Sequence, residues 1–119
     1  MSNYIDLSNK ELPTLRVILP RKRRFFKSRK LVLDVYTPTK STREMFMFLG
    51  ETLIKISKGE ATEEDVDNLY SVTARILSRN KQNTTVSQDI LEERLEIEDI
   101  VAILETYANF LTGAIESKN

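Results

Sequence analysis

The segment that most constrains the fold of this chain is the C-terminal stretch from Glu96 to Ser117. Its apolar residues recur at steps of three and four, which places them on one face of an α-helix. They are Ile97, Ile100, Val101, Leu104, Tyr107, Ala108, Leu111 and Ile115. Such a helix would extend roughly 33 Å. Because a long helix with one apolar face is not stable alone in water, the rest of the chain must cover it.

Two segments near the N-terminus alternate in polarity with a period of two, which predicts β-strands. They are Thr14–Leu19, which ends at Pro20, and Lys30–Tyr36, which ends at the turn 37–39. The short connection between them favours an antiparallel hairpin. Since an isolated hairpin is marginal in water, we expect its apolar face to pack on helices.

Capping signals predict three further helices, over residues 41–58, 62–79 and 87–95. Ser41 with Glu44 has the spacing of a capping box, and Thr62 and Ser87 are the expected N-caps of the next two helices. Gly59 is placed to end the first of these helices. The predicted fold class is α+β, mostly α: an N-terminal antiparallel hairpin on a bundle of about four helices. We expect a single domain over 1–119, with an arm and hairpin in 1–40 and the bundle in 41–119.

The composition argues against an enzyme. The chain has no His and no Cys, so it lacks the commonest general base, the commonest metal ligand and any thiolate nucleophile. Its three glycines form no phosphate-binding loop, and its acidic pairs lie where solvated helix faces are expected. We predict no catalytic residue, no cofactor and no metal. No apolar run is long enough to cross a membrane, so we expect a cytoplasmic protein.

The net charge of zero conceals a strong asymmetry along the chain. Residues 1–59 carry 13 basic and 5 acidic side chains, a net charge of +8, and residues 60–119 carry the reverse, a net charge of −8. The two halves could neutralise each other within one fold. Alternatively, copies could associate basic end to acidic end, or the basic end could bind an external polyanion.

The connection between the two predicted strands is strongly basic. Seven of the ten residues from Arg21 to Lys30 are Lys or Arg, and two are Phe. The candidate contact residues here are Arg21, Lys22, Arg23, Arg24, Phe25, Phe26 and Lys27. Basic and aromatic residues together suit phosphate neutralisation and base stacking, which makes a nucleic-acid contact one hypothesis. A solvated hairpin tip and an acidic protein partner, including another copy, are the alternatives.

The first predicted helix has more apolar surface than one buried face can accommodate. Residues 45–49 are five consecutive large apolar side chains, which point all around a helix. Either this helix is central in the monomer, or part of it forms a partner surface. The candidate partner-binding residues are Phe46, Met47, Phe48 and Ile54. Met and Phe are common in adaptable binding patches.

The layout of the chain resembles that of tail assembly chaperones of long-tailed (siphovirus-type) bacteriophages and prophages of Gram-positive bacteria. Four segments carry the resemblance, and their order and spacing matter more than any one of them. They are Ile5-Asp6-Leu7 followed by Pro13-Thr14-Leu15-Arg16-Val17, the strand and turn from Leu31 to Thr39, the helix end Ile76-Leu77-Ser78-Arg79-Asn80-Lys81 followed by Thr85-Val86-Ser87, and Tyr107-Ala108-Asn109-Phe110. The connection from Arg21 to Lys30 is more basic than is typical of that family.

The resemblance implies a non-catalytic protein of the bacterial host cytoplasm that is absent from the mature virion. It would bind the tape measure protein before the tail tube polymerises and would be displaced by the major tail tube protein. It would also self-associate into rings or spirals. The alternative is a small nucleic-acid-binding regulator that uses the basic connection.

Overall fold

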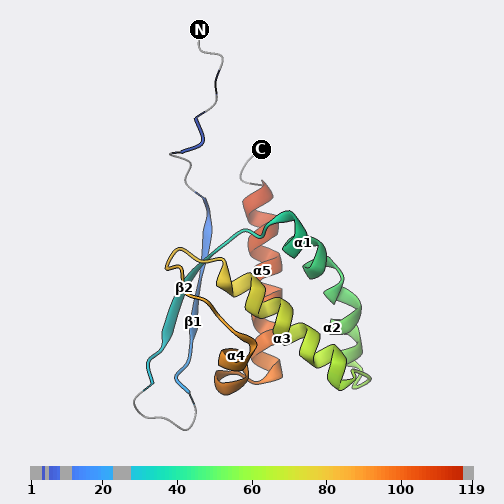
Figure 1. The fold of residues 1–119 in the computed structure, drawn as a ribbon. Helices are drawn as coiled ribbons and strands as arrows, with labels where there is room; N and C mark the ends of the chain where they lie inside the picture. The colour runs from blue at the N-terminus through green and yellow to red at the C-terminus, as the bar shows by residue number, and fades with distance from the viewer. Residues whose placement is uncertain (1–3, 5, 9–11, 23–27, 117–119) are drawn as a thin grey trace.

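The structure is a computed structural model that describes residues 4, 6–8, 12–22 and 28–116 of the chain, with the side chains of 114–116 left out. The described part consists of an N-terminal β-hairpin followed by five helices (Figure 1). The elements are β1 (Thr14–Leu19), β2 (Leu31–Tyr36), α1 (Lys40–Met47), α2 (Leu49–Ser57), α3 (Glu63–Ser78), α4 (Gln88–Arg94) and α5 (Ile97–Glu116). The predicted fold class, mostly helical with an N-terminal hairpin, is confirmed.

The hairpin pairs its strands antiparallel, as the alternating pattern predicts. Leu15 lies opposite Val35, Val17 opposite Leu33 and Leu19 opposite Leu31. These residues form the inner face, which packs on the helices. On the outer face, Ile18 lies opposite Val32, and Arg16 lies opposite Asp34 with its Nε donating to Oδ1 over 2.9 Å.

The free edge of β2 is covered by the segment that follows α3. Tyr36 N–H donates to the Arg79 carbonyl over 2.9 Å, and Lys81 N–H donates to the Asp34 carbonyl over 2.9 Å. Asp34 N–H donates to the side-chain oxygen of Gln82 over 2.8 Å. The chain after α3 therefore covers this edge through a single antiparallel bridge between Val35 and Asn80, which the sequence pattern does not predict, and the sheet itself remains two-stranded.

Two of the predicted helix starts are confirmed and one is wrong. Thr62 accepts a hydrogen bond from Asp65 N–H and forms a full capping box with it, and Ser87 caps α4 through Ile90 N–H. The N-cap of α1, however, is Thr39, which accepts from Thr42 N–H, rather than Ser41. Thr39 is still in an extended conformation directly after the turn, so its hydroxyl is free to turn back onto the helix.

The predicted single helix over 41–58 is two helices that meet at Phe48. Phe48 closes α1 and opens α2, and its N–H points to the carbonyl of Phe46 instead of continuing the helical ladder. Both α1 and α2 contact α3. The two-helix segment ends as predicted at Gly59, whose φ of 71° is favourable for glycine.

The long helix α5 runs behind α3, with the hairpin on one side and α1 and α2 on the other (Figure 1). Ile100, Leu104 and Tyr107 on its predicted face are almost fully buried. The buried face is wider than the sequence pattern indicates, because Ile103 and Phe110 also pack against the core. This helix is therefore the element that the others cover.

Tyr107 joins three elements at the centre of the molecule. Its hydroxyl donates to the Tyr36 carbonyl of β2 over 3.1 Å. The ring of Phe46 from α1 meets its ring edge-on, with 5.7 Å between centroids. Burial raises the pKa of the Tyr107 hydroxyl well above its ordinary value, and the charge of Arg79 opposes this only in part.

Candidate functional site

The break between α1 and α2 leaves two large apolar side chains in solvent. Met47 is 72% exposed and Phe48 is 80% exposed, and Ile54 in α2 is 55% exposed. We call Met47, Phe48 and Ile54 the α1–α2 apolar patch.

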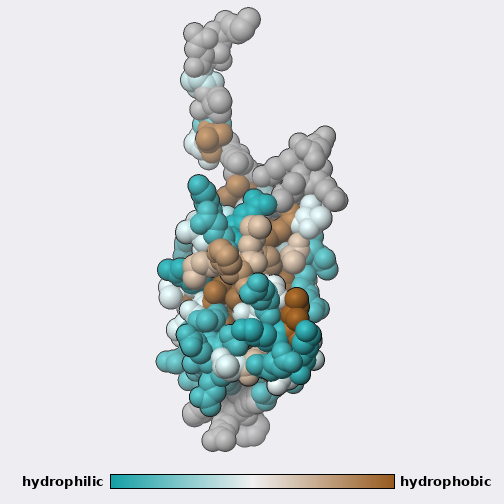
Figure 2. Space-filling view, turned by 90° about the vertical axis from the view of Figure 1, so that its right-hand side faces the viewer, coloured by the Kyte–Doolittle hydropathy of each residue, from teal (hydrophilic) through white to brown (hydrophobic). Residues whose placement is uncertain are grey.

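Figure 2 shows the side of the molecule on which α1 and α2 lie. Apolar residues gather in the middle of this side, and hydrophilic residues surround them. An apolar cluster with a polar rim is typical of a surface that contacts another protein. The sequence left two alternatives for the first predicted helix: a central position in the monomer, or a partner surface. This side of the molecule bears on them, because the rest of the fold covers the helical segment only in part and does not enclose it.

Phe46 differs from the other residues predicted at this surface. Its side chain is half-buried and packs against the core, with Tyr107 as its aromatic neighbour. Met45 on the preceding position also packs against the core. Sequence periodicity cannot tell which of five consecutive apolar residues are buried. In the structure, residues 45 and 46 point inward and residues 47 and 48 point outward.

The basic connection is described only at its two ends. Residues 23–27, which include the predicted contact residues Arg23, Arg24, Phe25, Phe26 and Lys27, lie outside the described residues. Arg21 is exposed, whereas Lys22 is half-buried with its Nζ 3.1 Å from the Glu93 carboxylate. One of the predicted basic residues therefore already neutralises an acidic residue of α4.

Arg94 of α4 anchors both ends of the basic connection, a role that the sequence does not reveal. It is only 8% exposed, and its Nη1 donates to the carbonyls of Pro20 and Arg29, each over 2.8 Å. Its buried Nε has no hydrogen-bond partner among the described residues. An arginine in the last turn of a short helix ordinarily suggests only a favourable interaction with the helix dipole.

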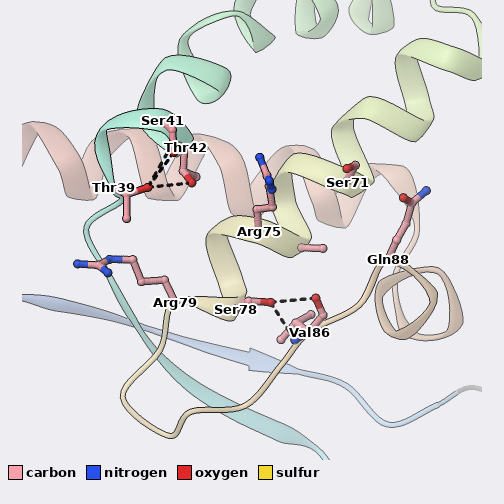
Figure 3. Close-up of a pocket in the computed structure, with 10 residues that line it drawn as sticks. Thr39, Ser41, Thr42, Ser71, Arg75, Ser78, Arg79, Val86 and Gln88 are labelled. Atoms are coloured by element: carbon pink, nitrogen blue, oxygen red, sulfur yellow. Dashed lines mark hydrogen bonds between the residues drawn. The ribbon is translucent and has the colours of Figure 1, made fainter.

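A polar pocket of about 640 Å³ lies between the start of α1, the second half of α3 and the start of α4 (Figure 3). Its lining contains two arginines and no carboxylate: Thr39, Ser41, Thr42, Ser71, Ala74, Arg75, Ser78, Arg79, Val86 and Gln88. Arg79 Nε donates to the Thr37 carbonyl and Arg75 Nη1 contacts the Met45 sulfur, each over 2.8 Å. Within the described part of the chain, neither arginine has a carboxylate within ion-pair distance.

The distribution of charge in space differs from its distribution along the sequence. Arg75 and Arg79 belong to the acidic half of the sequence, yet they lie beside the basic start of α1, near exposed Lys40 and Arg43. The acidic half concentrates its charge at the α4–α5 junction. There, six exposed carboxylates fall within eleven residues: Asp89, Glu92, Glu93, Glu96, Glu98 and Asp99.

Among the described residues, no group of three or more acidic side chains is close enough to hold a metal ion. The helices that the structure describes also include none that is both long and apolar enough to cross a bilayer. What the geometry offers is contact surface: the α1–α2 apolar patch, the polar pocket and the acidic junction.

Comparison with known proteins adds no assignment. No family model matches this chain, and no curated protein or solved structure is significantly similar to it.

Proposed function

We propose that this protein is a non-catalytic assembly chaperone that shields an apolar, helical client through the α1–α2 apolar patch. The observation that carries the proposal is the exposure of two adjacent residues, Met47 and Phe48. Each of them is more than 70% exposed to solvent. Leaving such residues in water is unfavourable by roughly 1.5–3 kcal/mol each relative to burial. A partner that covers them gains this free energy on binding.

The character of the patch suits a client without a single fixed shape. Met is flexible and polarizable, and Phe offers a large contact area, so both adapt to varied apolar surfaces. An amphipathic helix laid across the patch would bury its own apolar stripe at the same time. Together with the sequence resemblance, this supports the tape measure protein of a long-tailed phage as the client, with the major tail tube protein displacing the chaperone.

Self-association into a ring or spiral is part of the same proposal. The acidic α4–α5 junction and the basic surroundings of the polar pocket are complementary surfaces of one molecule. A contact between two different surfaces repeats head to tail and forms either a ring or a filament. The proposal also places the protein in the cytoplasm of the bacterial host and outside the mature virion.

The alternative function is binding of nucleic acid through the basic connection. In the described residues, exposed Arg21, Arg29 and Lys30 at its two ends favour this alternative. Binding of that kind would weaken steeply as the salt concentration rises.

The deciding test is recovery of the tagged protein from cells that express its native gene neighbourhood, after nuclease treatment. Mass spectrometry should identify a long helical protein in stoichiometric amount, retained at moderate salt. Phe48→Asp should reduce this client at least about tenfold, because loss of a central apolar contact costs more than ~1.4 kcal/mol of binding free energy. Co-purifying nucleic acid that nuclease removes, with no protein partner, would contradict the proposal and support the alternative.

Two matched variants separate client binding from folding. Phe48→Leu keeps an apolar side chain at the same place and should retain the client. Phe46→Asp places a charge against Tyr107 in the core, so it should lower the thermal unfolding temperature, which Phe48→Asp should leave nearly unchanged. If Phe48→Asp also unfolds the protein, Phe48 belongs to the core and the patch is not a free surface.

A further inference from the structure

Among the residues that the structure describes, no strand pairs with the outer edge of β1. The main-chain hydrogen bonds of β2 show which of its residues face away from β1. The strand register then shows which residues of β1 face away from β2. The N–H and C=O groups of Asp34 and the N–H of Tyr36 bond to residues 79–82, away from β1. Because successive residues of a strand point to opposite sides, Leu33 and Val35 must bond to β1.

The register then shows which main-chain groups of β1 are unpaired. Val17 and Leu15 face Leu33 and Val35, so they use their main-chain groups within the hairpin. The N–H and C=O groups of Arg16 and Ile18 therefore point outward. Neither residue makes a main-chain hydrogen bond on that side to any residue that the structure describes. Exposed edges of this kind are sites at which a further strand can add.

We propose that the β1 edge pairs with the β1 edge of a second copy, antiparallel and centred on Val17, to form a four-stranded sheet across a two-fold axis. In this register the second copy's Ile18 lies opposite Arg16, and the outward groups of these residues form four hydrogen bonds. Val17 lies opposite its own counterpart, and Leu15 lies opposite the second copy's Leu19. Every pair on the inner face is then apolar.

Charge selects this register and this occupant. A pairing centred on Arg16 would place two guanidinium groups opposite each other, which is destabilising. Pairing centred on Val17 separates them, and each Arg16 is already neutralised by Asp34 of its own copy. The strand therefore presents no net charge that would repel an identical strand.

The exposed surface of the hairpin also favours a second copy. Ile18 is 57% exposed and Val32 is 43% exposed, so the outer face carries an apolar pair that the described residues cover only in part. In the four-stranded sheet, the aliphatic part of the second copy's Arg16 would lie beside Ile18. Pro13 and Pro20 flank β1 and lack an N–H, which restricts the pairing to this short strand.

Cysteine cross-linking tests the register directly, because the chain has no cysteine of its own. In the proposed pairing, the two Val17 Cα atoms form a non-hydrogen-bonded pair at about 4.5 Å, within the range of a disulfide. Val17→Cys should therefore form a covalent dimer on oxidation. Arg16→Cys and Ile18→Cys should cross-link efficiently only when mixed with each other. Lys58→Cys, exposed at the end of α2, measures random collision.

A proline variant tests the outward hydrogen bonds. Ile18→Pro removes an outward N–H in each copy, two of the four bonds, while the bonds between β1 and β2 remain. At a salt concentration that screens the contact between the acidic α4–α5 junction and the basic surroundings of the polar pocket, light scattering should show dimer for the parent and for Ile18→Thr, and monomer for Ile18→Pro. A second variant, Arg16→Pro, removes the other outward N–H and should give the same result.

Several outcomes would overturn the inference. A parent protein that stays monomeric at high concentration has no such pairing. Cross-linking of Val17→Cys no faster than that of Lys58→Cys places any association elsewhere. Amide protection of β1 that requires an added client would make an extended client segment the occupant. Cross-linking at Val17 and the effect of Ile18→Pro report on the β1 edge alone, and neither depends on client binding or on the head-to-tail charged contact, so their failure is distinct from failure of the chaperone proposal.

Discussion

At the scale of single residues, Tyr107 shows how one side chain connects the hairpin to the bundle. Its hydroxyl supplies the hydrogen bond to the Tyr36 carbonyl, and its ring packs edge-on against Phe46 of α1. Tyr107 of α5 thus contacts both the hairpin and the helix that leads into the α1–α2 apolar patch. We expect a substitution of Tyr107 to lower the stability of the fold rather than to remove a binding contact.

Tyr107→Phe should lower the free energy of unfolding by about 1–2 kcal/mol, because it leaves the Tyr36 carbonyl without its donor. Burial raises the pKa of the hydroxyl, so above about pH 10 the unfolded chain ionises first and stability falls as pH rises through the folded pKa. The variant should show a shallower alkaline decline. Urea unfolding at neutral and alkaline pH checks both effects, and an unchanged neutral midpoint would contradict the role given to the hydroxyl.

At the scale of elements, α4 positions the hairpin although it is only seven residues long. Arg94 reaches the carbonyls at both ends of the basic connection, and Glu93 pairs with Lys22.

Arg94→Met should destabilise the fold by about 2 kcal/mol, since two charge-assisted hydrogen bonds are lost while the buried Nε is also removed. Hydrogen exchange should rise in β1 and β2 more than in α3. Glu93→Gln, a change at an exposed pair, should have little effect. Equal protection of the hairpin in both variants would show that α4 does not anchor it.

At the scale of the whole molecule, stability should respond to acid but be nearly constant between roughly pH 5.5 and 7.5. The chain has no His or Cys to titrate in that window. Hydrogen bonds from Arg16 and then Gln82 lower the pKa of Asp34, and a hydrogen bond from Thr62 N–H lowers that of Asp65. Because the folded pKa values lie below the unfolded value of about 3.9, this stability is present above that value and is lost as pH falls through the folded pKa. Thermal melts across pH should show the loss below about pH 4, and Asp34→Asn should reduce its slope. A midpoint that drops between pH 7 and 6 would contradict this account.

Much of the fold follows from local signals. The alternation in β1 and β2, the caps at Thr62 and Ser87, and the stop at Gly59 each depend on residues within one or two turns, and each is confirmed. The wrong N-cap at Ser41 has the same origin, because Thr39 and Ser41 are both acceptable cap residues and only the path of the incoming chain selects between them. The candidate site was less predictable: the sequence identified residues 46–48 as a group but could not separate Phe46 from its neighbours.

By itself, the sequence determined which segments form strands and helices and which face of α5 is buried, because these depend on the spacing of side chains along one element. Only the tertiary structure decided the break at Phe48, the exposure of Met47 and Phe48, the covering of the β2 edge by residues 79–82, and the open edge of β1. It also brought Arg75 and Arg79 beside the basic start of α1. The physical reason is that burial, edge pairing and local charge depend on which elements meet across the fold, and no pattern within a single segment encodes those meetings.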